Sequence, residues 1–268
     1  MSNYLALTDF TKAAENALIS ALNLAKKDNG KVTVLHVLES NGSDLIKKAE
    51  EKIVALRSSI NGSFHYKIIV GKLLKIIDKL IDELHIDYVV LGTHGVIGIQ
   101  KVLGSNALKL VNSTKKPFLI TQVGKTLDQI NNIVLPFSFS SESIQIGKVV
   151  AMLATTYNAK VHLVGYRDND EWLKNDMVRN QAIIKGAFKA QNANFEIVKL
   201  QRKGSFEKQL LEFAESIDAD LIAAGYFNGS RLIIRKNFVR DMISNKLKIP
   251  VLTLNAESLK NIGNFGSI

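Results

Sequence analysis

Cysteine is absent from this sequence of 268 residues. Without thiols the chain can form no disulfide, no thiolate metal site and no cysteine nucleophile. Long hydrophobic runs are missing as well, since no apolar stretch approaches the roughly 20 residues that a membrane helix needs. The N-terminus, Met1-Ser2-Asn3-Tyr4, lacks the basic segment and small-residue cleavage site of a secretory signal. These absences lead us to expect a cytoplasmic protein with no membrane attachment.

A concentrated patch of one charge is also lacking, although Lys and Arg outnumber Asp and Glu by 35 to 25, for a net charge of +10. Residues 1–128 hold 17 basic and 12 acidic side chains, and the remaining residues hold 18 and 13. The excess is therefore divided evenly, and no aromatic residues alternate with the cations as stacking platforms for bases. Nucleic-acid binding remains only a weaker alternative, which a steeply salt-dependent affinity for DNA would support.

What is present is ordinary globular material, with 46% hydrophobic and 22% charged residues. Its length suits about two domains, and three pairs of segments match in the same order. The pairs are 31–37 with 160–166 at an offset of 129, and 86–92 with 219–225 and 116–120 with 249–253 at an offset of 133. The repeat predicts two homologous domains, 1–124 and 130–255, a linker over 123–129 and a fraying tail, 256–268.

Within the first domain the hydrophobic periodicity alternates between that of strands and that of helices. Strands are expected at 4–7, 32–38, 64–70, 88–91 and 118–122, and helices at 12–27, 43–59, 73–84 and 106–113. Ser43 is the expected N-cap of the second helix. This order predicts an α/β fold of two tandem Rossmann-like domains, each a five-stranded parallel sheet with helices on both faces.

One glycine-rich segment, from Gly92 to Ser105, follows the fourth expected strand. Glycines allow a backbone to approach an oxyanion closely, and a helix N-terminus adds partial positive charge. Ser105 could cap the following helix and donate its hydroxyl to a phosphate. The segment has neither the Walker A ending nor the position of a dinucleotide fingerprint. From the glycines alone, a phosphate loop and a tight strand-to-helix connection are equally good interpretations.

The segment resembles that of the universal stress proteins in their tandem form, and the resemblance covers about residues 3–255. Family members carry Gly-x-x-Gly, a spacer and Gly-Ser/Thr, which cradle the phosphates in those that bind ATP. Gly92, Gly95, Gly104 and Ser105 match this pattern, with a spacer over 96–103 one residue shorter than usual. The resemblance implies the adenine nucleotide alpha hydrolase-like form of the fold and binding of ATP, together with a divalent ion such as Mg²⁺.

The resemblance also assigns further residues to the nucleotide site. Asp9 matches an aspartate near the adenine, and Val37 matches a position whose backbone meets the base. Leu7 stands where a proline is frequent, His94 lies between the first two glycines, and Asn106 follows Ser105. Gly71 matches a glycine that opens the third helix of the family. No metal ligands are assigned.

The second copy differs at these positions. The replacements are Ser138 for Asp9, Phe227 for His94, Asn228 for Gly95, Asn237 for Gly104 and Phe238 for Ser105. A phenylalanine at the helix mouth removes a donor and fills the space of a phosphate. The second copy is therefore expected to keep the fold without binding ATP in the family manner, and to carry structure or another ligand.

These observations predict an ATP-binding stress-response regulator that acts on an unidentified protein partner. The alternative is a nucleotide-free interaction scaffold in which both copies have lost ATP binding. No catalytic constellation is evident, and the histidines do not cluster at metal-ligand spacing, so we expect no enzyme, with slow ATP hydrolysis left open. The final strands begin at Pro117 and Pro250, and the resemblance implies that they pair as an intramolecular pseudo-dimer, with further dimerisation open.

Overall fold

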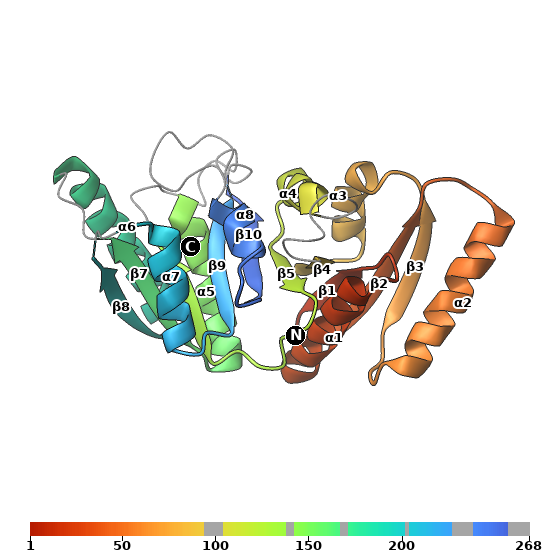
Figure 1. The fold of residues 1–268 in the computed structure, drawn as a ribbon, viewed down its shortest axis with the longest axis horizontal. Coiled ribbons are helices and arrows are strands. Elements are labelled where there is room, and N and C mark those ends of the chain that lie inside the picture. The colour runs from red at the N-terminus through yellow and green to blue at the C-terminus, as the bar shows by residue number, and fades with distance from the viewer. Residues whose placement is uncertain (94–103, 138–141, 167–170, 202–203, 227–237, 257–268) are drawn as a thin grey trace. The chain divides into compact units, whose positions relative to one another are not determined.

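The computed structural model of the chain describes residues 1–93, 104–137, 142–166, 171–201, 204–226 and 238–256. The chain divides into two compact units, Met1–Gln129 and Ile130–Ile268 (Figure 1). The expected tail falls almost wholly outside the described residues. Each unit is described below by itself.

The first unit alternates strands and helices from its start. Its elements are β1 (Asn3–Leu7), α1 (Lys12–Asp28), β2 (Lys31–Leu38), α2 (Ser43–Ser59), β3 (His65–Val70), α3 (Leu73–Glu83), β4 (Tyr88–Thr93), α4 (Gly104–Ser113) and β5 (Phe118–Gln122). The strands lie in the order β3-β2-β1-β4-β5 and every pair is parallel. From β1 the chain adds β2 and then β3 on one side, and it then crosses back to add β4 and β5 on the other side of β1.

The second unit has the same order of elements. They are β6 (Asn132–Pro136), α5 (Glu142–Tyr157), β7 (Lys160–Tyr166), α6 (Glu171–Ala190), β8 (Asn194–Leu200), α7 (Phe206–Ser216), β9 (Leu221–Tyr226), α8 (Phe238–Ile243) and β10 (Val251–Asn255). The strand order, β8-β7-β6-β9-β10, matches that of the first unit, and the pairs are again parallel.

Helices cover both faces of each sheet. Right-handed crossovers place α1 and α2 on one face of the first sheet and α3 and α4 on the other. The Tyr4 hydroxyl donates to Asp28 at the end of α1 (3.0 Å), so the side chain of Tyr4 lies on the α1 face. In the second unit α5 packs on α6, and α7 packs on α8. The predicted fold class is confirmed.

One predicted helix cap and one predicted helix start are wrong. The N-cap of α2 is Gly42 rather than Ser43, which is the first helical residue, and no side chain caps this helix. Helix α4 begins at Gly104, two residues before the expected start. Ser105 therefore lies within the first turn instead of at the cap. Gly104 was assigned to the glycine-rich loop, whereas it is the first residue of α4.

Each sheet has, at its amino-terminal edge, an equivalent hydrogen bond from a backbone N–H to an aspartate, which we call the aspartate clamp. The backbone N–H of Asn3 donates to the carboxylate of Asp87 (2.9 Å), and that of Asn132 donates to Asp220 (3.0 Å). Each aspartate immediately precedes the strand that continues the sheet on the other side of β1 or β6. The carboxylate thus ties the first strand to the fourth strand of its unit at equivalent positions.

The segment expected to be a linker is bound along α1. The Asn16 amide donates to the carbonyl oxygens of Gln122 (3.1 Å) and Lys125 (2.5 Å). The Ser20 hydroxyl accepts from the N–H of Leu127 (3.0 Å), and both Ser20 and Leu127 are buried. Because buried polar groups must be paired, these bonds make the segment an integral part of the first unit.

Candidate functional site

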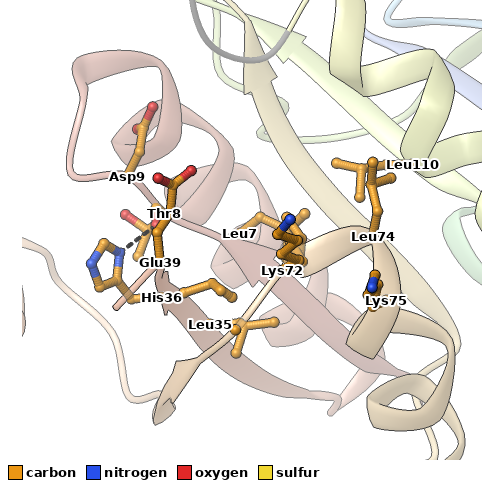
Figure 2. Close-up of a pocket in the computed structure, with 13 residues that line it drawn as sticks. Leu7, Thr8, Asp9, Leu35, His36, Glu39, Lys72, Leu74, Lys75 and Leu110 are labelled. Atoms are coloured by element: carbon orange, nitrogen blue, oxygen red, sulfur yellow. Dashed lines mark hydrogen bonds between the residues drawn. The ribbon is translucent and has the colours of Figure 1, made fainter. Parts of the chain in front are cut away.

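A cavity of about 730 Å³ lies at the carboxyl ends of β1 and β2 in the first unit (Figure 2). In open parallel sheets ligands bind at this edge, where the winding direction reverses. Three segments and one residue of α4 line the cavity: 7–9, 35–37 with Glu39, 71–75, and Leu110. The carboxyl ends of β1 and β2, the start of α3 and the body of α4 thus contribute one wall each.

Three of the predicted site residues meet in this cavity. Leu7, Asp9 and Val37 all line it, as does Gly71, whose φ of 152° suits glycine. Leu7 is the last residue of β1 and pairs with Leu35. Residues up to 30 positions apart that the sequence assigned to one site therefore line one cavity.

The backbone of Val37 faces the cavity for a reason of register. The N–H of Thr8 donates to the carbonyl of Leu35 (2.9 Å), so Leu35 directs its polar backbone groups toward β1. Residues two apart in a strand direct these groups to the same side. Val37 therefore turns its N–H and C=O toward the β1 side, where β1 has already ended at Leu7.

Asp9 is held by the first turn of α1. Its Oδ1 accepts from the N–H (3.0 Å) and the hydroxyl (2.6 Å) of Thr11. Thr11 is in turn the N-cap of α1 and accepts from the N–H of Ala14. The carboxylate is therefore positioned by a helix cap, and its orientation does not depend on a bound ligand.

A ring cluster supports the turn that carries Thr8 and Asp9. Phe10 adopts a left-handed backbone conformation (φ 62°), and its ring lies against that of His36, with centroids 4.5 Å apart. The Lys52 ammonium lies over the Phe10 ring, 5.2 Å from its centroid. Nδ1 of His36 is 2.9 Å from the carbonyl oxygen of Thr8, an acceptor, so this nitrogen carries a proton. Sequence reasoning treated His36 as an ordinary strand residue and missed this role.

The predicted phosphate loop is described only at its two ends. Gly92 is the fifth residue of β4, and a Cβ built there would lie 1.9 Å from the carbonyl oxygen of Ala13 in α1. Glycine is therefore required at this position by the packing of α1 on the sheet, whatever the loop binds. Gly104, Ser105 and Asn106 form the first turn of α4. His94 and Gly95 lie outside the described residues.

Other cavity residues escaped the sequence analysis. They are Thr8, Glu39, Lys72, Leu73, Leu74, Lys75 and Leu110, together with Leu35 and His36. Lys72 and Lys75 belong to an amphipathic pattern whose polar face reads as ordinary solvent-exposed surface. The signal that could have found them is their position directly after Gly71, at the carboxyl edge of the third strand.

In the second unit two aromatic residues stand at positions whose counterparts are Leu73, which lines this cavity, and Ser105. Phe206 begins α7, as Leu73 begins α3, and Phe238 stands where the first unit has Ser105. The two rings stack with centroids 6.1 Å apart, and Phe238 is 1% exposed. Four of the other replacements, Ser138, Phe227, Asn228 and Asn237, lie outside the described residues.

A buried histidine distinguishes the second unit at the opposite edge of its sheet. Nδ1 of His162 lies 2.6 Å from Glu196, and Nε2 lies 3.1 Å from the side-chain oxygen of Asn132. Lys160 forms an ion pair with the same glutamate (2.7 Å). Burial lowers the pKa of His162, and Glu196 only partly offsets this. The hydrogen bond from Lys160 lowers the pKa of Glu196.

Two searches across the described part of the chain were negative. No described helix has the length and apolar character needed to cross a bilayer. Among the described side chains, no group of three or more His, Asp or Glu is placed to hold a metal ion.

Comparison with known proteins identifies relatives of this fold. The model of the universal stress protein family matches residues 1–122. A universal stress protein from Archaeoglobus fulgidus superposes with a TM-score of 0.69 at 16% identity, over 95% of this chain and 98% of its own. A putative universal stress protein from Pseudomonas aeruginosa gives 0.62 at 12% identity, over 98% and 97%. At such identities the likenesses establish the fold alone.

A universal stress protein solved in complex with cAMP covers 48% of this chain and 98% of its own, at 18% identity and a TM-score of 0.37. Its ligand is a property of that protein. No curated protein sequence matches the chain.

Proposed function

Because residues 1–122 belong to the universal stress protein family, we propose that the first unit binds ATP, with a divalent ion such as Mg²⁺, in the cavity at its carboxyl edge. The chain would then act as a stress-response regulator whose ATP-bound form engages a protein partner. The observation that carries this proposal is the convergence of Leu7, Asp9 and Val37 on a cavity of about 730 Å³. A volume of this size is within the range of small-molecule sites.

The adenine is assigned to the apolar part of the cavity. Leu7, Leu35 and Leu110 supply apolar walls, against which a flat base buries its faces. The backbone of Val37 offers a donor and an acceptor to the base edge. Since Thr11 occupies Oδ1 of Asp9, Oδ2 is the oxygen that a ligand group would meet.

The phosphates are assigned to the loop between β4 and α4. Gly92 ends this loop on the strand side, and Gly104, Ser105 and Asn106 begin the helix on the other. His94 and Gly95 complete the proposed set. The first turn of a helix has N–H groups without intrahelical partners, which suits an anion.

The second unit is proposed to be a second copy that has lost this site. The stack of Phe206 on buried Phe238 stands at the positions of Leu73 and Ser105 in the first unit. One ATP per chain is therefore expected. We further place the protein in the cytoplasm, where ATP is abundant, and assign it no catalytic residues.

Isothermal titration of the full chain with ATP and Mg²⁺ tests the proposal. One binding site is expected, and Gly104→Phe combined with Ser105→Phe should abolish it while circular dichroism and thermal unfolding show a folded protein. Adenine nucleotide identified by mass after denaturation of the purified protein would be independent support. Absence of ATP binding by the wild-type chain would favour the nucleotide-free scaffold instead, and binding unaffected by the double variant would place ATP elsewhere.

A further inference from the structure

The walls of the cavity carry opposite charges at different places. Asp9 and Glu39 come from the ends of β1 and β2, whereas Lys72 and Lys75 come from the start of α3. Figure 2 shows Asp9, Glu39 and His36 together on one side of the drawn site, with Lys72 nearer its centre and Lys75 beside Leu74. A ligand in the cavity would therefore meet two ammonium groups on the α3 side.

Neither lysine is neutralised within the part of the chain that the structure describes. No ion pair joins Lys72 or Lys75 to a described carboxylate, although Lys79 on the same helix pairs with Glu83 (3.5 Å). Asp78 stands three residues after Lys75, at a spacing that allows a helical ion pair, but the two side chains form none, and the residue four positions on is another cation, Lys79. Lys72 and Lys75 are themselves three residues apart and repel one another.

At the corresponding positions the second unit lacks one of these charges and pairs the other. Ser205 replaces Lys72, and its hydroxyl caps α7 by accepting from the N–H of Lys208. Lys208 replaces Lys75 but pairs with Glu212 (3.7 Å). Glu207 lies in the first turn of α7, whereas the first turn of α3 contains no acid. The unit with the Phe206–Phe238 stack is thus also the one whose lysine is neutralised.

We propose that Lys72 and Lys75 bind a phosphoryl group of the nucleotide and are the residues by which this site prefers nucleotides to nucleosides. The inference rests on the proposed function. Two like charges on a cavity wall favour an anion between them, and because both lysines are exposed, this attraction is weakened by salt. Each lysine acts as a point charge with several donors, which suits a tetrahedral phosphoryl group.

A phosphoryl group could reach the lysines from two parts of an adenine nucleotide. One source is the 5′ chain, bent back from the loop before α4, and the other is a phosphate on the ribose. The chemistry recognised is the same in both cases, and the ligand panel below separates them.

The test is titration of adenosine, ATP and adenosine 3′,5′-bisphosphate into the full chain. Lys72→Gln with Lys75→Gln should weaken binding of the phosphorylated ligand by about tenfold to thirtyfold and leave adenosine within about twofold. In this double variant the affinity for the phosphorylated ligands should also depend less on salt concentration. Lys72→Arg with Lys75→Arg should restore most of the affinity. Lys79→Gln, on the same helix but outside the cavity and already paired, is the matched control and should change nothing.

Loss confined to ATP assigns the contact to the 5′ chain, and loss that is larger for the bisphosphate assigns it to the ribose. An unchanged ratio of ATP to adenosine affinity in the double variant overturns the inference while the proposed function stands. A wild-type chain that binds none of the three ligands overturns both.

Discussion

The first turn of α3 and the first turn of α7 hold the same place in their units but have opposite chemistry. In the first unit Lys72 and Lys75 border a cavity, and no side chain caps the helix. In the second, Ser205 caps the helix and Phe206 stacks on buried Phe238. The amino-terminal edges, in contrast, share the same aspartate clamp. Interactions that hold the strands together are common to both units, and the differences lie at the edge where parallel sheets bind ligands.

Among the variants that test this comparison, Gly92→Ala should have the largest effect on stability. The added Cβ would lie 1.9 Å from the backbone oxygen of Ala13, so α1 would have to move away from the sheet. We expect the first unit to lose about 3 kcal/mol or more of unfolding free energy. Urea unfolding followed by circular dichroism measures the loss, and the fluorescence of the only tryptophan, Trp172, reports the second unit.

Gly186→Ala is the matched control for that variant. A Cβ at Gly186, inside α6, would have nothing within 4 Å. Replacing a helical glycine should stabilise the second unit by about 0.5–1 kcal/mol. A Gly92→Ala protein as stable as the wild type would show that α1 does not approach β4 as closely as described.

Phe238→Ala should have the next largest effect, this time on the second unit. Removing a side chain that is 1% exposed leaves a cavity beside Phe206, at a cost of about 3–5 kcal/mol. The Trp172 transition should shift to lower urea, and ATP binding by the first unit should not change. Met152→Ala, at a residue that is 58% exposed, should stay within about 0.5 kcal/mol. Loss of ATP binding in the Phe238→Ala protein would contradict assignment of the site to the first unit.

Removing the shared clamps tests what the units have in common. Asp87→Ala deletes an acceptor of one backbone N–H, and Asp220→Ala deletes an acceptor of two, those of Asn131 (2.7 Å) and Asn132 (3.0 Å). Each should cost about 1.5–3 kcal/mol, with the larger value for Asp220. The two effects should add in the double variant, because the sites have no shared partner. An Asp220→Ala protein as stable as the wild type would show that these hydrogen bonds do not stabilise the second unit.

The smallest expected effect depends on pH and is confined to the second unit. Because burial lowers the pKa of His162 below its ordinary value of 6.5, the folded state favours the neutral ring. Its contribution to stability is therefore present above about pH 6.5 and is lost as the pH falls through the lowered pKa. The Tm of the wild type should fall between pH 7.5 and pH 5. Because glutamine carries no charge at either pH, the Tm of the His162→Gln variant should fall by about 2 °C less. An identical pH profile in the variant would show that His162 does not titrate in this range.

Periodicity predicted the fold because the apolar faces of helices and buried strands leave a direct record in the chain. Every strand and helix expected in the first unit is present within a few residues. Helix ends were harder, since Gly42 rather than Ser43 is the N-cap of α2, and α4 begins at Gly104, which was assigned to a loop. The predicted site residues that the structure describes at the cavity, Leu7, Asp9 and Val37, lie at or next to the ends of strands that periodicity locates.

The rest of the cavity could not be predicted because its wall is formed by packing between elements. Lys72 and Lys75 lie on the polar face of α3, and nothing in their spacing separates a cavity wall from solvent-exposed surface. The support that His36 gives to Phe10 depends on a left-handed turn, which no pattern of residue types near Phe10 indicates. The sequence analysis assigned Gly92 to phosphate binding. The structure shows that packing alone requires glycine there, because the backbone of Ala13 leaves no room for a Cβ.

The bonds that tie the segment after β5 to α1 decide where this protein can be cut into pieces. A fragment that stops at residue 122, where the family match ends, would lose two hydrogen bonds. They are the bond from the N–H of Leu127 to the buried Ser20 hydroxyl and the bond from the Asn16 amide to the carbonyl of Lys125. A fragment that runs to residue 129 keeps both, and also keeps the contact between Asn23 and Asp128 (2.7 Å). The natural end of the first unit for expression, labelling or exchange between relatives is therefore Gln129.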